Sequence, residues 1–344
     1  MEMPIENTAL VLERLEQDLA GNAPKVLGAD LARMSSGGSR YYYRIVDGEV
    51  KWYPSVTTIA GRMIPKSPAF YDWYASQGGS RNVKLYSDMR ARYGSAMHEY
   101  IGSFLKNGSE WRVSIDDLIE RHKPVGNPFY SEDEWREDLW HDLEAFVRFV
   151  NDYNVEWLGL ELGVYSDVMH FAGSIDLLVE MDIDTVEVEE PTGEEYKRNG
   201  NGFKKGDPKM HTVKKPVRGK ALIDFKSGRK GFFEEHKFQL QAYLRAANEL
   251  WPELEIVACY NWAPSNKTKR KYSLRDQSTN NSYGKPKVIE GMCWTHLQLH
   301  NMRPPENIPV YPDGLKVGDE PDELVTTANL DELILTNHPL LHEL

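Results

Sequence analysis

The sequence predicts an α/β fold, in which helices flank a central mixed sheet. The chain has 344 residues, of which 40% are hydrophobic and 11% aromatic, which is enough to bury a sizeable core. Its central part changes between apolar spacing typical of helices and alternation typical of strands, in the order helix, strands, helix, strand. Internal repeats are absent from the sequence, so we expect one domain with appendages.

The N-terminal region is expected to contain helices and a hairpin. Leucines at helical spacing between residues 10 and 19 predict an amphipathic helix over residues 1 to about 22. Farther along, Asp47-Gly48 separates two strand-like runs, 41–46 and 50–53. Asp-Gly between such runs is a strong signal for a hairpin turn.

The later elements follow from the same two periodicities. Helices are predicted at 89–105, 132–153 and 234–250, and strands at 158–165, 171–181, 221–226 and 255–262. These elements make up an expected core over 89–300, preceded by the N-terminal region, 1–88, and followed by an acidic, proline-containing tail, 301–344. Near the end of this tail, a short helix is expected around 330–335.

Residues 183–219 are an insertion in the predicted core. Their first half is rich in acidic residues and their second half in basic residues. We expect either a long hairpin extension or a partly mobile loop, because no helical periodicity is present. A second basic segment, 267–275, is expected to be a loop.

Charge and cysteine content exclude several classes of protein. Cys259 and Cys293 are too few for a disulfide framework, a four-thiolate zinc site or an iron–sulfur cluster. The sequence has neither the apolar run of a membrane span nor the pattern of a signal peptide, so a cytoplasmic protein without membrane partners is expected. The formal charge of −12 repels DNA on average, so a nucleic-acid role requires local basic patches and bound cations.

Asp224 and Lys226 are the first candidates for chemistry. Residues two apart in a strand share a face, so their side chains project together, whereas Ile223 and Phe225 face apolar packing. A carboxylate beside an ammonium, followed by Ser227-Gly228, can hold a divalent cation and orient a water. An exposed ion pair on a solvated strand is the alternative.

Other polar residues lie within apolar runs. Asp176 needs either a positive partner or a metal, unless its strand is an edge that meets solvent. Glu161 is a further carboxylate that could lie on the same face. On the helix at 89–105, His98 has small neighbours one turn away and is either open to a ligand or an ordinary packed histidine. Gln239 and Tyr243 lie one helical turn apart. Together they could present an amide and a phenol to a backbone phosphate or to these carboxylates. The alternative is that both belong to the edge of the core.

The order of these residues carries a resemblance. The motifs are Gly94-x-x-x-His98 on a helix, Gly173-Ser174-Ile175-Asp176, Asp224-Phe225-Lys226-Ser227-Gly228 and Gln239-Leu240-x-x-Tyr243. As an ordered set, covering about 94–262, they resemble the PD-(D/E)XK nuclease superfamily and, within it, the RecB-type exonuclease branch. The resemblance implies a restriction-endonuclease-like core.

The resemblance also implies a metal-dependent reaction on DNA. By this likeness His98, Asp176, Asp224 and the carbonyl of Phe225 would hold Mg²⁺ or Mn²⁺. Lys226 would be the catalytic lysine, and Gln239 and Tyr243 would support the site and touch DNA. Further candidates for contact with DNA are Gly94, Ser227 and Glu161. The sequence departs from the family after His98, where the expected glutamate is missing, and in the length of the 183–219 insertion.

A shorter likeness lies upstream. Residues 53–59 are similar to the serine–valine–threonine segment of mitochondrial genome maintenance exonucleases and some phage relatives. By this likeness Ser55 and Thr57, at the start of a helix, would bind a phosphate. An ordinary N-cap at Ser55 or Thr57 explains the same residues.

The expected function is therefore a Mg²⁺- or Mn²⁺-dependent deoxyribonuclease, an exonuclease acting on single-stranded DNA or DNA ends in replication, recombination or repair, in a bacterial or phage-infected cell. The basic residues of 183–219 and of 267–275, with aromatic residues at 41–43 and 52–53, are expected to guide the strand; the alternative for the basic runs is a solvated loop. Three alternatives remain open: a structure-specific endonuclease, a catalytically silent DNA-binding or assembly module of the same fold, and a scaffold whose acidic tail binds a protein partner.

Overall fold

The architecture is seen in a computed structural model. It describes residues 31–36, 39–107, 114–198, 204–228, 232–265, 269–300, 302–303, 309–310 and 325–326. The helices predicted over 1–22 and around 330–335 lie outside these residues, as does nearly all of the tail.

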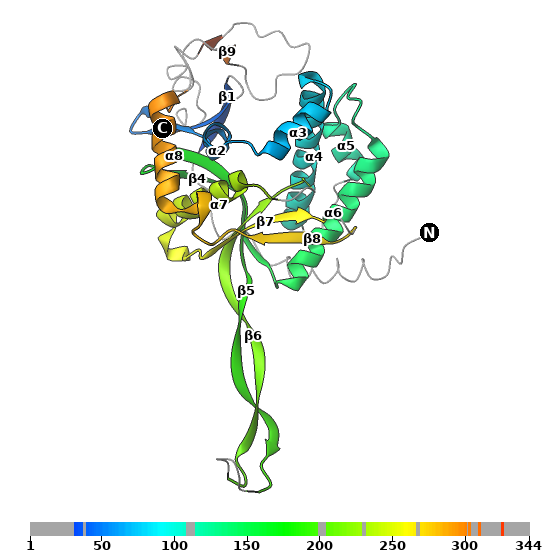
Figure 1. Cartoon of the computed structure of the whole chain (residues 1–344), viewed down its shortest axis with the longest axis vertical. Coiled ribbons are helices and arrows are strands. Elements are labelled where there is room, and N and C mark those ends of the chain that lie inside the picture. The colour runs from blue at the N-terminus through cyan, green and yellow to red at the C-terminus, as the bar shows by residue number, and fades with distance from the viewer. Residues whose placement is uncertain are drawn as a thin grey trace.

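The main sheet is mixed, as predicted. Within the described part of the chain it has the order β4-β5-β6-β7-β8 (Figure 1). Neighbouring strands are antiparallel except for β6 and β7, which are parallel. The strands are β4 (Glu156–Ser166), β5 (Phe171–Glu195), β6 (Pro208–Phe225), β7 (Ala258–Pro264) and β8 (Tyr272–Asp276).

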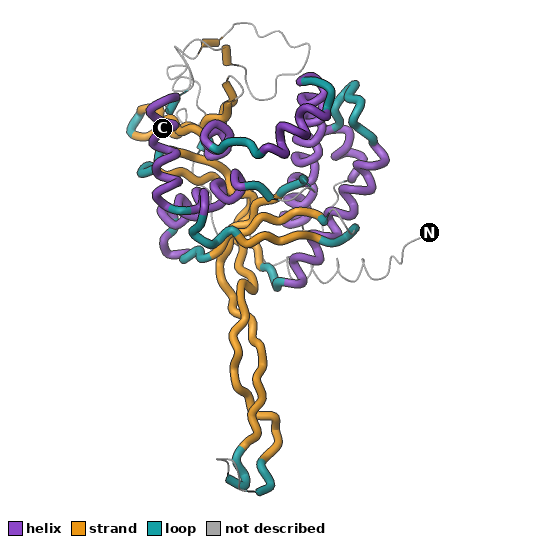
Figure 2. Tube along the Cα trace, in the orientation of Figure 1, coloured by secondary structure: helices purple, strands orange, loops and turns teal. Residues whose placement is uncertain are grey.

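Helices cover both faces of this sheet, so the architecture is α/β (Figure 2). On one face, α4 (Ser80–Asn107), α5 (Ile115–His122) and α6 (Glu132–Asp152) enclose one hydrophobic cluster. On the other, α2 (Val56–Met63), α7 (Glu234–Leu250) and α8 (Pro286–His300) enclose a second. The chain crosses between β6 and β7 through α7, which a parallel pair requires.

A smaller antiparallel sheet precedes the core. It consists of β1 (Ala32–Ser36), β2 (Ser39–Val46) and β3 (Glu49–Pro54). Asp47 and Gly48 both have positive φ, 52° and 78°, which is the backbone of the predicted hairpin turn. An isolated parallel bridge between Ser55 and Ala172 connects this region to β5, and α3 (Pro68–Ser76) follows α2.

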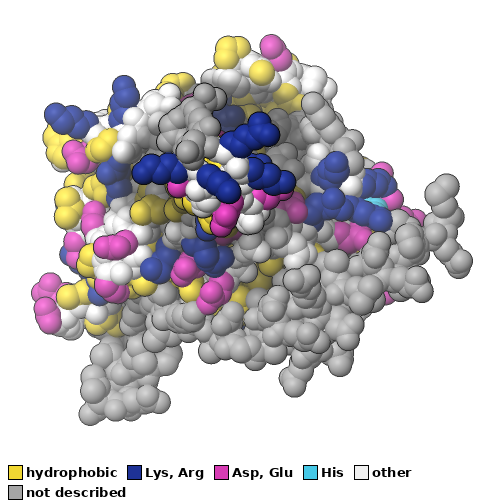
Figure 3. All heavy atoms as spheres, turned by 90° about the horizontal axis from the view of Figure 1, so that it is seen from below, with side chains coloured by type: hydrophobic (Ala, Val, Ile, Leu, Met, Phe, Trp, Pro, Cys, Tyr) yellow, Lys and Arg dark blue, Asp and Glu magenta, His cyan; other side chains and the backbone are white. Residues whose placement is uncertain are grey.

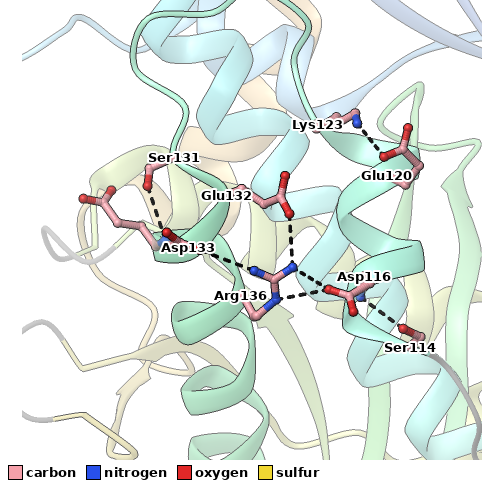
Figure 4. Close-up of polar contacts among 9 residues, drawn as sticks. Ser114, Asp116, Glu120, Lys123, Ser131, Glu132, Asp133 and Arg136 are labelled. Atoms are coloured by element: carbon pink, nitrogen blue, oxygen red, sulfur yellow. Dashed lines mark hydrogen bonds and ion pairs between the residues drawn. The ribbon is translucent and has the colours of Figure 1, made fainter.

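Surface ion pairs connect α5 and α6 (Figure 4). The guanidinium of Arg136 on α6 lies 2.6 Å from Asp116 on α5 and 3.1 Å from Glu132 in its own first turn. Ser114 and Ser131 cap the two helices with their hydroxyl oxygens. These contacts join the two helices at their N-terminal ends on the surface.

The 183–219 insertion is a long β-hairpin arm, not a loop. Beyond Asp182 the ends of β5 and β6 pair with each other and leave the sheet, standing clear of the helices (Figure 1). The acidic strand lies against the basic one, and ion pairs cross between them, such as Lys209 with Glu194 at 2.9 Å. Figure 3, which looks along the arm, shows Lys and Arg side chains interspersed with Asp and Glu.

The sheet is irregular around Asp176. Its neighbours Ile175 and Leu177 belong to opposite hydrophobic clusters, although strict alternation would place both on one face. Opposite them on β4, Glu161 has φ of +52°, and the register shifts between Trp157 and Gly159. The predicted alternation of 158–165 is therefore wrong at residue 160, whose side chain packs against the first cluster, while its predicted partners at 158, 162 and 164 lie in the second.

Other boundaries differ in detail. The helix predicted at 89–105 begins nine residues earlier, at Ser80, and crosses the expected boundary at residue 88. The basic segment 267–275 contains most of strand β8, and α3, α5, α8 and β1 were not predicted. Short elements complete the described chain: η2 (Pro252–Leu254), η3 (Ser282–Gly284), β9 (Pro309–Val310) and β10 (Val325–Thr326). Among the described helices, none is long and apolar enough to cross a membrane.

Candidate metal centre and nucleic-acid cleft

A cleft of about 700 Å³ opens between α4, the irregular part of the sheet and the N-terminal hairpin. Its lining combines carboxylates from the sheet and from α4 with cationic side chains. The cations are Arg33, Arg40, Lys106 and Lys226, and the carboxylates are Glu99, Glu161, Asp176 and Asp224. A polyanion could therefore meet positive charge here despite the negative charge of the whole chain.

His98, Glu161 and Asp176 converge in this cleft. Each offers a ligand atom within 4.8 Å of the others. Nδ1 of His98 is 3.8 Å from a carboxylate oxygen of Glu161 and 3.8 Å from one of Asp176. An imidazole with two carboxylates is a donor set that fits a divalent cation such as Mn²⁺ or Mg²⁺.

The electrostatics of this group favour added positive charge. Burial by itself lowers the pKa of His98, but the carboxylates of Asp176 and Glu161 outweigh it and raise the pKa to about 9. Burial raises the pKa of Asp176 to about 7, with the charge of Asp224 adding to the shift against the opposing charge of His98. Crowded carboxylates are stabilised by a proton or a cation.

Backbone and ring contacts orient these ligands. The backbone N–H of Phe225 donates to Oδ2 of Asp176 at 2.7 Å. The ring of Phe225 packs edge-on against the ring of His98, with centroids 5.5 Å apart. The hydroxyl of Ser174 donates to Glu161 at 3.4 Å. β5 and β6 therefore position the ligands from α4 and β4.

Asp224 lies beside this group, in a separate network. The ammonium of Lys226 is 2.6 Å from its Oδ2, so the predicted shared face is confirmed. Gln239 donates to Oδ1 at 3.0 Å, and Asn261 donates to Oδ2 at 2.7 Å. Both oxygens of Asp224 therefore accept hydrogen bonds, and this carboxylate lies outside the three-residue ligand group. Metal ligation by Asp224 and by the carbonyl of Phe225 stays a prediction.

Gln239 and Tyr243 brace this network from α7. The amide of Gln239 donates to Asp224, its carbonyl oxygen accepts from Lys226 at 3.2 Å, and its NH₂ lies 3.4 Å from the Tyr243 hydroxyl. Burial raises the pKa of Tyr243 well above its usual value, so its phenol stays protonated. Of the two predicted roles, contact with the site carboxylates is the one realised here; contact with a phosphate stays a prediction.

Gly94 and Ser227 meet where α4 passes the end of β6. A Cβ at Gly94 would lie 3.1 Å from the hydroxyl oxygen of Ser227, so the glycine permits the close approach. The guanidinium of Arg90 donates to the carbonyl of Ser227. Gly94 lines the cleft, and its contact with DNA stays a prediction.

Ser55 and Thr57 have different roles. Ser55 is buried, and its hydroxyl accepts the N–H of Thr58 at 3.0 Å, so it is the N-cap. Thr57 is exposed and lines the cleft. The ordinary cap explains Ser55, and of the two only Thr57 faces the cavity.

Most of the residues predicted to guide a strand lie away from the cleft, and their contact with DNA stays a prediction. Tyr41, Trp52 and Tyr53 are buried in the packing of the N-terminal hairpin, whereas Tyr42 lines the cleft. The basic residues of the arm lie beyond Asp182. From Asp176 to the end of β5 at Glu195 the strand is roughly 60 Å long, since strands rise about 3.3 Å per residue. In the 267–275 segment, Lys269 pairs with Glu137 and Arg270 with Glu144 at 3.0 Å, both on α6, and Lys267 lies outside the described residues.

Several site residues were not predicted. Asn261 is fully buried, and its Oδ1 accepts from Gln277 at 2.9 Å. Gln241 in turn donates to the carbonyl of Gln277 at 2.6 Å. The signal for Asn261 was present, since an amide within the apolar run of β7 needs a buried partner, as Asp176 does. No sequence pattern indicated Arg33, Arg40 or Lys106, which reach the cleft from separate elements.

Comparison with known proteins adds no identification. No protein-family model matches the chain, and no curated protein matches it. The site therefore has to be interpreted from its own geometry.

Proposed function

We propose that the protein is a metal-dependent deoxyribonuclease that hydrolyses phosphodiester bonds, with a restriction-endonuclease-like core. The observation that carries the proposal is the meeting of His98, Glu161 and Asp176 with the Asp224–Lys226 pair in one cleft lined by cations. The motif order in the sequence supports the same assignment, and it is the only support for exonuclease over structure-specific endonuclease action.

His98, Glu161 and Asp176 would hold Mg²⁺ or Mn²⁺, with Asp224 as a further ligand once released from its amide partners. When bound, the ion supplies Lewis-acid stabilisation of the charge that develops on the phosphate. Lys226 lies where its ammonium can orient a water, since it is held by Asp224 and Gln239. The cations Arg40 and Lys106 on the rim would hold the flanking phosphates.

The test uses purified protein with end-labelled single- and double-stranded DNA in Mg²⁺ or Mn²⁺. Lys226→Met and Asp176→Asn should reduce cleavage at least 100-fold, the scale expected for removing a group that acts in catalysis. Lys214→Met on the arm and Glu253→Gln in η2 are matched exposed controls and should cleave at the wild-type rate.

Metal binding can be measured apart from cleavage. Calorimetry with Mn²⁺ alone should detect a site in the wild type that His98→Ala and Glu161→Gln weaken, while Glu253→Gln leaves it unchanged. Cleavage that survives Lys226→Met and Asp176→Asn would refute the assignment. DNA binding without turnover in any divalent metal would favour the silent module instead.

A further inference from the structure

A second cavity of about 780 Å³ adjoins the cleft. The two share Thr57, Lys226 and Gln239 in their linings, so a ligand held at Lys226 can extend into either space. The second cavity lies between the loop connecting α2 to α3 and the start of α7. It is large enough for a small organic group, within the usual range of ligand pockets.

The two cavities differ in chemistry. The cleft is lined by cations and carboxylates, whereas the second cavity is lined by aromatic rings from three elements: Phe70 on α3, Phe232 and Phe233 before α7, and Tyr283 in η3. Its Lys66 is paired with Glu235 at 2.8 Å, so the charges of these two side chains are balanced. One space therefore suits phosphates and the other suits a flat uncharged ring.

Phe233 is the most distinctive of these aromatic residues. Its side chain is 55% exposed, although burial of a phenyl ring is favourable. It packs against His236 with ring centroids 5.5 Å apart and an interplanar angle of 70°. Burial, and then the charge of Lys226, lowers the pKa of His236 to about 4, so this ring is uncharged at neutral pH.

We infer that this aromatic pocket binds an unpaired nucleobase next to the phosphate held in the cleft, so that the substrate strand is single at that point. The inference rests on the proposed nuclease function. Bases offer a π-face to aromatic side chains whatever their identity, so such a pocket selects single strands without selecting sequence. A base inside a duplex is stacked and paired, and reaches the pocket only after being extruded.

The experiment uses the full chain and single-stranded oligonucleotides with 2-aminopurine at successive positions, in Ca²⁺. Stacking in the pocket should quench the fluorescence of the probe at one or two positions. Phe233→Ala and Phe70→Ala should remove that quenching and weaken binding about tenfold, the effect of losing one base–aromatic stack. Phe233→Trp should preserve both signals.

Trp294→Ala is the matched control, because Trp294 is an exposed aromatic residue, 64% accessible, on α8 and outside the pocket lining. It should leave quenching and affinity unchanged. The backbone N–H of Phe233 donates to His236, so replacing the side chain preserves that cap, and circular dichroism should confirm an intact fold.

The outcomes separate the two proposals. Wild-type protein that cleaves DNA, with quenching and affinity unaffected by Phe233→Ala and Phe70→Ala, overturns the base pocket alone. Equal quenching in fully paired duplex overturns the single-strand requirement. Wild-type protein that neither binds nor cleaves any DNA overturns the proposed function and the pocket together.

Discussion

Gly173 lies on β5 against the phenol of Tyr243, and this contact gives a sharp test of how the site is braced. A Cβ at Gly173 would lie 2.3 Å from Cε1 of Tyr243 and 2.6 Å from both Cζ and the hydroxyl oxygen. Carbon atoms in contact normally lie about 3.5–4.0 Å apart, so Gly173→Ala cannot fit without movement. We expect the variant to lose about 1–3 kcal/mol of unfolding free energy, the usual cost of overpacking a core.

The displacement should also reach the site. Tyr243 is buried and contacts the amide of Gln239, which donates to Asp224. Moving the ring therefore disturbs the group that holds the Asp224 carboxylate. We expect cleavage by Gly173→Ala to fall by more than the loss of folded protein explains, measured at a temperature where the variant remains folded.

Urea unfolding followed by tryptophan fluorescence measures the cost, and the chain contains nine tryptophans. Gly291→Ala is the matched control: it has open space around the added methyl group on α8, and should be stabilised by about 0.5–1 kcal/mol. The double variant Gly173→Ala with Tyr243→Leu should recover stability relative to the sum of the single variants, by about 1–3 kcal/mol of coupling. Additive effects, or a Gly173→Ala variant within 0.5 kcal/mol of wild type on the scale of neutral surface changes, would refute the predicted clash.

Three further predictions concern the network, the hairpin and the arm. Asn261→Ala should lower the unfolding free energy measured in urea by about 2–5 kcal/mol, because a hydrogen bond to the Asp224 carboxylate is lost and the amide of Gln277 loses its partner. A loss below 1 kcal/mol would contradict this. Burial tends to raise the pKa of Asp167, but the ammonium of Lys51 and the hydroxyl of Tyr53 outweigh it and hold the pKa below its usual value. The stability that Asp167 adds should therefore be present above about pH 4 and lost as pH falls through its folded pKa. The unfolding free energy of Asp167→Asn should differ from that of wild type at pH 6 and converge with it near pH 2. A difference that is constant with pH would refute this cause. Replacing 185–215 with a two-residue turn should leave the cleavage rate on short single strands unchanged, because the arm stands clear of the cleft. A large loss of rate on these strands would show that the arm belongs to the active site.

Sequence periodicity predicted the elements whose packing is regular. The predicted helices 132–153 and 234–250 correspond to Glu132–Asp152 and Glu234–Leu250, because each has an apolar stripe against the sheet and acidic residues in its first turn. The pairing of Asp224 with Lys226 followed from strand geometry alone. These features depend on neighbours in sequence, which a pattern can record.

The arm illustrates a signal that was present and incompletely used. An acidic run followed by a basic run permits cross-strand ion pairs along a hairpin, and these pairs are formed, as between Lys214 and Glu187 at 3.9 Å. Such exposed pairs are individually weak, so the extended pairing of backbone groups must contribute most of the order. Several cations of the arm face acidic partners within it, and no described residue of the arm lines the cleft, so guidance of DNA by the arm stays a prediction.

The ligand group could not be obtained from periodicity, because it exists where the sheet departs from it. If β4 and β5 alternated regularly through Glu161 and Asp176, the residues flanking Asp176 would share one hydrophobic cluster, yet they lie in opposite ones. The positive φ of Glu161, 52°, belongs to the same irregularity, and non-glycine residues in this region are uncommon. At this irregularity the two carboxylates lie within reach of His98. Strained backbone is common at functional sites, where the surrounding structure holds it in place. Restoring an unstrained backbone with Glu161→Gly should therefore stabilise the fold while abolishing Mn²⁺ binding, whereas Glu161→Gln should lower Mn²⁺ affinity without that gain in stability.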